Sequence, residues 1–429
     1  MTTNVVESYL KISDPLQIDE SVSEYNYHNY EPVAGSNLNS NQQIRILIEN
    51  QDLFYLPSKS FLTIKGKFVK SDGAKLADTD VATLVNNGIM YLFDRIELQI
   101  GDKVIEYINH PGQCTLMKGL LSYPKDFEYT GLNMCWTLDK GRGDASLIAN
   151  NGFKLRHEKI QIRGDGNFSF VIPLSHIFGF CEDYKKVIYG VKFTLILTRC
   201  GNEDAIFKSS IVLCKVAITN ITWTMPNIVP NFEQLNPLYK MIESKKSFPI
   251  GFMYRNMDSY DVAQSNEFTW RLGPRSASEK PRYTIIAFQT DRYKNVDRNP
   301  AVFDHCDVRD IHVNLNADRY PNIDIINNFR SEDYSFTYHS AKQFRENYYG
   351  LNDNYNDFMI SLNDFKDLYP LFVIDVSKQS ERLKNSISDI TIRVRFNSNV
   401  PAFTKCYCLI LSDRLMKITS DGSRMMIDY

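Results

Sequence analysis

The sequence has few tryptophans, 3 against 25 tyrosines and 26 phenylalanines. It also lacks any run of about 18 apolar residues, which a membrane-spanning helix needs. Its first ten residues have neither the basic start nor the apolar centre of a signal peptide. We therefore expect no membrane span.

Neither sign of charge is in excess, since 49 lysines and arginines stand against 51 aspartates and glutamates. Proteins that bind nucleic acid tightly through a folded domain usually carry a basic face. The charge balance therefore predicts no strong nucleic-acid binding.

Motifs of the common enzyme classes are absent: there is no GxSxG, HExxH or Walker A pattern. The Cys residues have no CxxC spacing and are predicted to be free, mostly buried thiols. His305 and His312 are seven residues apart, which does not match zinc-ligand spacing. A glycosidase needs only two carboxylates, but we interpret acid pairs such as Glu182 and Asp183 as surface charge. We predict no catalytic residue, no cofactor and no metal site.

Apolar residues alternate with polar ones over most of the chain, which is the pattern of half-buried β-strands. The clearest runs begin at residues 44, 62, 96, 168, 193, 212, 283, 311, 371, 390 and 406. Helical spacing is rare, with one short candidate at residues 114–121 and another at 341–348. The composition and the patterning predict an all-β protein with a few short helices in loops.

The alternation divides the chain into four segments. Residues 1–40 are polar and are predicted to form an N-terminal arm. Residues 41–225 form a first strand-rich domain, and residues 226–249, which lose the rhythm and contain Pro226, Pro230 and Pro237, form a linker. Residues 250–429 form a second strand-rich domain with a C-terminal tail.

The two halves share the order of their features. Asp94–Ile100 and Arg309–Leu315 place three apolar residues identically, and each is followed by one helix candidate. A long loop and a Phe-rich segment come next in each half, at Phe168–Phe178 and Phe358–Leu368. Long connections between strands favour jelly rolls over simple meanders. We predict two tandem eight-stranded jelly-roll sandwiches of matching topology.

Three segments resemble a known family. They are Asn86–Ile100, Pro281–Thr290 with the nearby Asn299-Pro300 and Phe303-Asp304-His305, and Val313–Pro321. In their order along the chain they resemble the double jelly-roll major capsid proteins of the adenovirus-like lineage, most closely those of Polinton/Maverick elements, adintoviruses and virophages.

The resemblance implies a structural major capsid protein. Three chains with two similar sandwiches each would form a pseudo-hexagonal homotrimer, and such trimers would tile an icosahedral shell. The implied partners are other copies of the chain, a vertex (penton) protein and minor capsid proteins. The implied location is the virion capsid, after synthesis in the host cytoplasm or nucleus. Two alternatives remain: a jelly-roll carbohydrate-binding module and a capsid-like protein encoded in a host genome.

Two RGD triplets occur, Arg142-Gly143-Asp144 and Arg163-Gly164-Asp165. Such a triplet on an exposed loop can bind integrins, as in some adenovirus pentons. Glycine between charged residues is also ordinary turn chemistry. We favour the turn and keep receptor binding as the alternative.

The predicted arm contains three tyrosines, Tyr25, Tyr27 and Tyr30. Tyrosine suits interfaces because it joins a large apolar ring to a polar tip. We expect these residues to contact neighbouring subunits, and we expect a chain without residues 1–38 to keep both sandwiches folded.

The predicted strand at residues 390–396 gives a testable prediction of which side chains face the core. Because strand faces alternate with period two, Ile392, Val394 and Phe396 should face the core while Arg393 and Arg395 face solvent.

Overall fold

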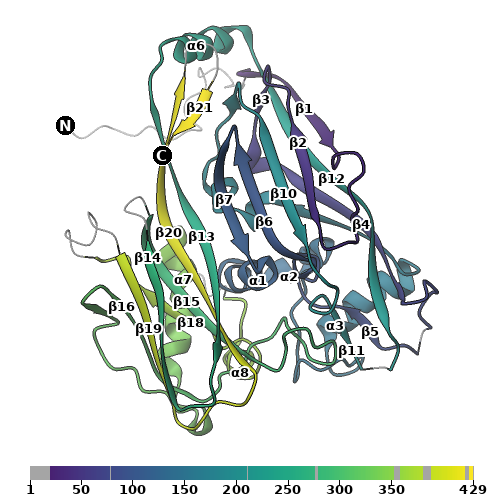
Figure 1. Ribbon diagram of the computed structural model, residues 1–429, viewed down its shortest axis with the longest axis vertical. Helices are drawn as coiled ribbons and strands as arrows, with labels where there is room; N and C mark the ends of the chain where they lie inside the picture. Colours follow the sequence, from purple (N-terminus) through teal and green to yellow (C-terminus); the bar gives the residue numbers. More distant parts are fainter. Residues whose placement is uncertain are drawn as a thin grey trace, which may run out of the picture.

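The chain folds into two β-sandwiches that stand side by side (Figure 1). The computed structural model describes residues 20–77, 79–209, 211–275, 279–351, 358–379, 388–420 and 425–428.

The first sandwich has two four-stranded layers, in the orders β8-β4-β12-β1 and β2-β10-β6-β7. Its main strands are β1 (Val22–Tyr30), β2 (Gln43–Ile48), β4 (Phe61–Lys70), β6 (Phe93–Ile100), β7 (Lys103–Asn109), β8 (Asn167–Pro173), β10 (Phe193–Arg199) and β12 (Cys214–Pro230). The short strands β3 (Phe54–Tyr55) and β9 (Ile188–Tyr189) extend the first of these layers. The short strands β5 (Ala82–Leu84) and β11 (Ile206–Lys208) pair with each other in a separate two-stranded sheet.

The second sandwich has layers in the orders β13-β20-β15-β18 and β14-β19-β16-β17. Its strands are β13 (Phe248–Val262), β14 (Glu267–Arg275), β15 (Glu279–Thr290), β16 (Val308–Leu315), β17 (Asp318–Tyr320), β18 (Phe372–Asp375), β19 (Ser388–Phe396) and β20 (Thr404–Ser420). A final strand, β21 (Met425–Asp428), pairs with β20.

Both sandwiches have the same topology. Numbered by their eight main strands in chain order, one layer of each has the order first, eighth, third, sixth, and the other has second, seventh, fourth, fifth. This is the jelly-roll arrangement. The predicted pair of eight-stranded jelly rolls with matching topology is confirmed. We call them the first jelly roll (residues 22–230) and the second jelly roll (residues 248–420).

In the described part of the chain, the α-helices lie in the connections between strands. They are α1 (Pro111–Ser122), α2 (Glu128–Gly131), α3 (Asn151–His157), α4 (Leu174–Ile177), α5 (Gly179–Asp183), α6 (Phe232–Glu243), α7 (Ser335–Tyr349) and α8 (Leu362–Asp367). The two predicted helices are confirmed as α1 and α7, and each lies in the connection after the fifth main strand of its jelly roll. In Figure 1, α6 lies at the top end and the long loops with α3 and α8 lie at the bottom.

The predicted N-terminal arm differs from the structure. Residues 1–19 lie outside the described residues, but residues 22–30 form β1, which pairs with β12. This strand could not be recognised in the sequence, because its residues are exposed on both faces and therefore show no apolar alternation. Deleting residues 1–38 would remove β1, so the expectation that the truncated chain keeps both sandwiches intact no longer holds.

The predicted linker also differs. Strand β12 continues through Pro226 to Pro230, and α6 occupies residues 232–243. Pro226 is tolerated in a strand because it sits opposite Tyr27 at a position where β12 donates no hydrogen bond to β1. The peptide oxygen of Pro226 instead accepts from the Leu56 N–H on the other side of the strand, at 3.0 Å.

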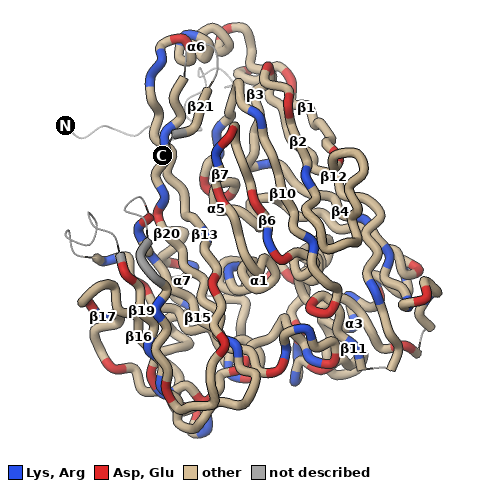
Figure 2. Tube along the Cα trace, in the orientation of Figure 1, with Lys and Arg blue, Asp and Glu red and all other residues tan. Residues whose placement is uncertain are grey.

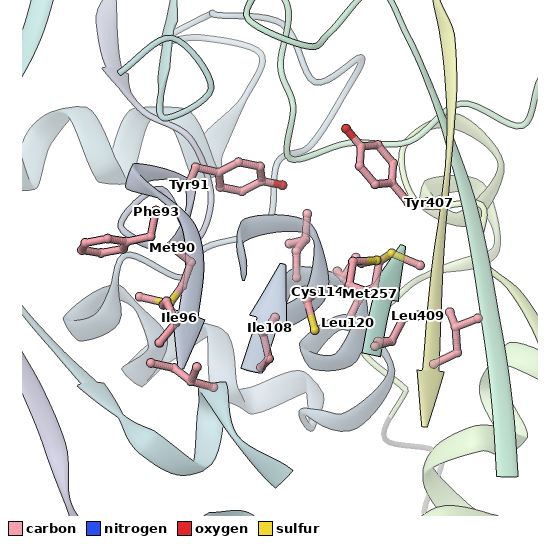
Figure 3. Packing of buried hydrophobic residues seen from close by; sticks show 14 of the residues in the cluster. Met90, Tyr91, Phe93, Ile96, Ile108, Cys114, Leu120, Met257, Tyr407 and Leu409 are labelled. Atoms are coloured by element: carbon pink, nitrogen blue, oxygen red, sulfur yellow. The ribbon is translucent and has the colours of Figure 1, made fainter. Parts of the chain in front are cut away.

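Buried apolar residues form one cluster that runs through both jelly rolls. Figure 3 shows how α1 links them: Cys114 and Leu120 lie between Ile108 of the first jelly roll and Met257 and Leu409 of the second. The two halves therefore share one core.

The register prediction for β19 is confirmed. Ile392, Val394 and Phe396 are 0%, 1% and 4% exposed, while Arg393 and Arg395 are exposed. All eight cysteines are free thiols, and five of them are buried. Acidic and basic residues are interspersed over the described part of the chain (Figure 2).

No helix in the described part of the chain is both long and apolar enough to cross a membrane.

Candidate functional site at the joint between the jelly rolls

The most highly organised polar site of the molecule lies where β13 meets the first jelly roll. β13 is an edge strand, and edge strands leave backbone N–H groups without a sheet partner. Two carboxylates of the first jelly roll accept from these groups: Asp183 Oδ2 from the Met253 N–H at 2.7 Å, and Glu106 Oε1 from the Arg255 N–H at 3.0 Å. The open edge of one jelly roll is thus capped by side chains of the other.

Glu106, on β7, also binds the start of α5. Its carboxylate accepts from the backbone N–H groups of Gly179 at 3.2 Å and Phe180 at 3.0 Å. The side chain is fully buried, and burial raises the pKa of Glu106 to about 7, although Arg255 and the three N–H donors oppose the rise. Glu106 therefore fixes β7, α5 and β13 to one another.

The Arg255 guanidinium crosses the joint from β13 into the first jelly roll. It is buried, and it donates to the backbone oxygens of Ser175 at 3.0 Å, His176 at 2.5 Å and Ile177 at 2.8 Å. It also forms an ion pair with Glu182 on α5, at 2.7 Å. One side chain of the second jelly roll thus binds four groups of the first.

Lys118, on α1, completes the cluster. Its Nζ lies 2.8 Å from Ser122 Oγ, 2.9 Å from Tyr349 Oη on α7 and 3.4 Å from both carboxylate oxygens of Glu182. Burial lowers the pKa of Lys118 to about 8, and the carboxylate of Glu182 limits the fall. Tyr349 belongs to the second jelly roll, so this contact also crosses the joint.

The interpretation as ordinary surface charge is wrong for Glu182, whereas Asp183 is exposed, as that interpretation expects. Glu182 pairs with two buried cations, and its pKa is lowered to about 2 because Lys118 and Arg255 outweigh the effect of burial. Asp183 caps β13. The sequence reasoning failed because two adjacent acids on a short segment carry no sign of the partners that tertiary folding brings to them.

Glu106 did carry a sequence signal that was overlooked. It shares strand parity with the buried Ile108, and a charged residue at an inward position is rare unless it has partners. Arg255 and Lys118 carry no comparable signal.

Chemically, the cluster is suited to holding the jelly rolls together. Glu182 is negatively charged, Arg255 and Lys118 are positively charged, and Glu106, with a pKa of about 7, is only partly ionised near neutral pH. Each of the four groups is bound to neighbours. The cavity beside them has a volume of about 90 Å³. The cluster therefore resembles a buried structural network more than a substrate site.

A second set of buried bonds joins the loops of the two halves. Arg156 and Asp139 form an ion pair at 2.7 Å, with both side chains fully buried. Tyr369 of the second jelly roll accepts from the Asp139 backbone N–H at 2.9 Å, and Tyr91 Oη donates to the Pro300 backbone oxygen at 2.8 Å. The joint therefore extends from β13 to the long loops.

The raised pKa of Glu106 predicts a pH dependence. Because the folded-state pKa of about 7 exceeds the ordinary 4.5, this group's contribution to stability is complete below pH 4.5 and is lost as the pH rises through 7. Between pH 4.5 and 7, the free energy of unfolding of the wild type, measured with urea, should fall by up to about 1.4 kcal/mol per pH unit relative to that of Glu106→Gln. The exposed control Glu49→Gln should keep the wild-type slope. Parallel curves for wild type and Glu106→Gln would contradict the expectation.

The first RGD triplet is only partly exposed. Gly143 is buried against Leu368 and Val302 with φ of 69°, and its backbone oxygen accepts from Asn299 Nδ2 at 3.3 Å. Arg142 and Asp144 are exposed. Gly143 therefore allows a tight turn that packs against the second jelly roll.

The second triplet also forms a turn. Arg163 and Asp165 are exposed, Asp165 has φ of 53°, and its carboxylate forms an ion pair with Lys75. Gly164 leaves no room for a side chain, since a Cβ there would meet the Asn167 backbone oxygen. Both triplets fit the turn interpretation, and receptor binding stays a prediction.

The three tyrosines of the predicted arm lie on β1. Tyr25 and Tyr27 are 43% and 60% exposed, and their rings meet edge to face with centroids 5.2 Å apart. Tyr30 is half-buried, with its hydroxyl 3.3 Å from that of Tyr55. Their role as subunit contacts stays a prediction.

The remaining candidates show structural roles. His305 stacks on Phe329, with centroids 4.5 Å apart, and His312 lies 3.3 Å from Asp310. Among the described residues, no group of three or more His, Cys, Asp or Glu could hold a metal ion. Trp136 and Trp223 are fully buried and Trp270 is 8% exposed, so tryptophan forms no surface platform.

Comparison with known proteins gives one family match. The family model for a double jelly roll-like domain matches residues 82–416. No curated protein matches the sequence.

Solved structures share the fold at low identity. VP54 of PBCV-1, fitted into a reconstruction of the virophage Sputnik, aligns with a TM-score of 0.61 at 8% identity, over 95% of this chain and 97% of that chain. The Sputnik virophage structure gives 0.57 at 9% identity, over 100% and 93%. The mavirus major capsid protein gives 0.55 at 12% identity, over 99% and 93%.

Proposed function

Because the chain belongs to the double jelly roll-like family, we propose that it is a structural major capsid protein. Its homotrimers are pseudo-hexagonal capsomers, and these tile an icosahedral shell of the adenovirus-like lineage, of the Polinton/Maverick, adintovirus and virophage type.

One observation carries this proposal: the joint within the chain connects unlike edges of two like domains. The β7 edge of the first jelly roll meets the β13 edge of the second, and the two jelly rolls have the same topology. Repeating a joint between unlike surfaces builds a ring when the rotation closes. Three chains then place six similar jelly rolls around one axis.

The solved structures support the same role. They include the capsid of PBCV-1 and the major capsid proteins of Faustovirus and mavirus. We extend that role to this chain, with a vertex protein and minor capsid proteins as further partners and the virion capsid as its location. A copy encoded in a host genome would have the same assembly.

We further propose that the chain acts without catalysis. Glu106, Lys118 and Glu182 have strongly perturbed pKa values, and all three are engaged in the joint between the jelly rolls. Their perturbation has a structural cause.

A carbohydrate-binding module is less well supported. Such modules usually stack sugars on exposed aromatic platforms, and here two of the three tryptophans are fully buried. The exposed Tyr25 and Tyr27 lie on an edge strand.

The test is the assembly state of the purified chain. We expect sedimentation at about three times the 49.7 kDa mass of one chain, and capsid-like shells in negative stain at high concentration. A chain that stays monomeric at every concentration would overturn the proposal. A monomer that binds glycans would establish the carbohydrate-binding alternative.

A further inference from the structure

The first jelly roll has its own counterpart of β13, and none of the described residues covers that strand. β1 and β13 are both the first strand of a jelly roll, and both pair with its last strand. Yet β13 is buried along much of its length, whereas eight of the nine residues of β1 are exposed.

Residues of the two strands can be matched through their sheets. The sixth strands end alike, with Phe170-Val-Ile-Pro173 in β8 and Phe372-Val-Ile-Asp375 in β18. In the first jelly roll, Pro173 pairs with Phe61, Phe61 with Thr224, and Thr224 with Asn29. In the second, Asp375 pairs with Tyr283, Tyr283 with Leu411, and Leu411 with Arg255. Asn29 is therefore the counterpart of Arg255, and Tyr27 is the counterpart of Met253.

The backbone of β1 is open where β13 is capped. In an antiparallel ladder the N–H and C=O of one residue point to the same side. The peptide oxygen of Pro226 binds Leu56, away from β1, so its partner Tyr27 directs its own N–H away from β12. Asn29 lies two residues further along β1, so its N–H also points away from β12. No side chain of the described residues accepts from either N–H group, whereas Asp183 and Glu106 cap their counterparts.

The second jelly roll has an unused counterpart of the β7 edge. Glu106 pairs with Leu98 in β6, and Tyr320 pairs with Val313 in β16. Leu98 and Val313 occupy the same place in the repeated segments Asp94–Ile100 and Arg309–Leu315, so Tyr320 is the counterpart of Glu106. Beyond it, Ile323 and Ile326 are each 51% exposed.

We propose that the open edge of β1, centred on Tyr27 and Asn29, binds a second copy of this chain through its β17 edge, at Tyr320 and residues 321–326. This rests on the proposed capsomer and names the surface that closes it. Continuity with the joint within the chain supports it, because the two surfaces left open are the counterparts of the two surfaces already joined.

The new interface has a different chemistry from the joint that it repeats. Arg255 and Glu106 are replaced by Asn29 and Tyr320, so no buried charge cluster forms. A charge that becomes buried loses its favourable hydration free energy. In a joint within one chain, this loss occurs once, during folding. Neutral polar and aromatic groups suit surfaces that must stay in water before assembly.

Cross-linking tests the contact directly. Full-length chain carrying Tyr27→Cys and Tyr320→Cys is treated with a short bis-maleimide beside the wild type and each single variant. We expect linked dimers and trimers on denaturing gels from the double variant alone. Trimers in solution without this cross-link would overturn the inference and leave the proposed capsomer standing. Cross-linking of the Tyr27→Cys variant to itself would show a twofold contact and also overturn the inference. Monomers at every concentration would overturn both.

A charge variant with a matched control tests the energetics. Tyr27→Lys should weaken trimer formation about tenfold or more, because a central interface tyrosine is lost and a charge is placed at the edge. Its thermal midpoint as a monomer should stay near the wild-type value. Tyr129→Lys, at a loop residue that is 90% exposed, should assemble as the wild type does. Equal assembly of both variants would overturn the inference.

Discussion

Replacing Val394 with aspartate is expected to abolish soluble expression of the chain. Val394 is 1% exposed in the middle of β19, paired with Phe268 on one side and Ile311 on the other. An unpaired carboxylate at such a position costs about 3–5 kcal/mol. That cost is comparable with the whole stability of many domains, about 5–15 kcal/mol.

The neighbouring residue provides the control. Arg393 lies on the solvent face of the same strand, so Arg393→Asp should leave most of the protein soluble and folded. Soluble yield and circular dichroism of both variants are the measurements. Equal loss for the two would contradict the assignment of strand faces.

Replacing Arg255 with methionine should loosen the joint between the jelly rolls. Methionine fills similar space, but it leaves Glu182 without its shortest ion pair and the backbone oxygens of Ser175, His176 and Ile177 without their donor. Breaking one side of a buried pair typically costs about 3–5 kcal/mol. We expect a lower urea midpoint and faster proteolysis in α6, which connects the two halves.

Two comparisons separate this effect from a general loss of charge. Arg271→Met removes an arginine that is 71% exposed and paired with Asp389, and it should change stability little. The double variant Arg255→Met with Glu182→Gln should recover part of the loss, because it also removes the carboxylate that has lost its shortest ion pair. An Arg255→Met midpoint equal to that of the wild type would show that the cluster does not hold the joint.

The strands that could be predicted are those with one buried and one exposed face. β6, β16 and β19 can be identified directly from the alternation of apolar and polar residues along them. β1 could not be predicted because it is exposed on both faces and is held by backbone pairing with β12. Backbone pairing leaves no signature in side-chain polarity.

The sequence by itself determined the two jelly rolls and their shared order, because apolar alternation and turn residues act over a few residues at a time. The tertiary structure alone decided the joint. Glu106, Glu182 and Arg255 are far apart in the chain, and they become partners only when β7, α5 and β13 pack together. A buried charge is stable only beside its counter-charge, and which residues meet depends on how whole sandwiches dock. The open edge of β1 has the same origin, since only the docked pair shows which edge is covered and which is left for another copy.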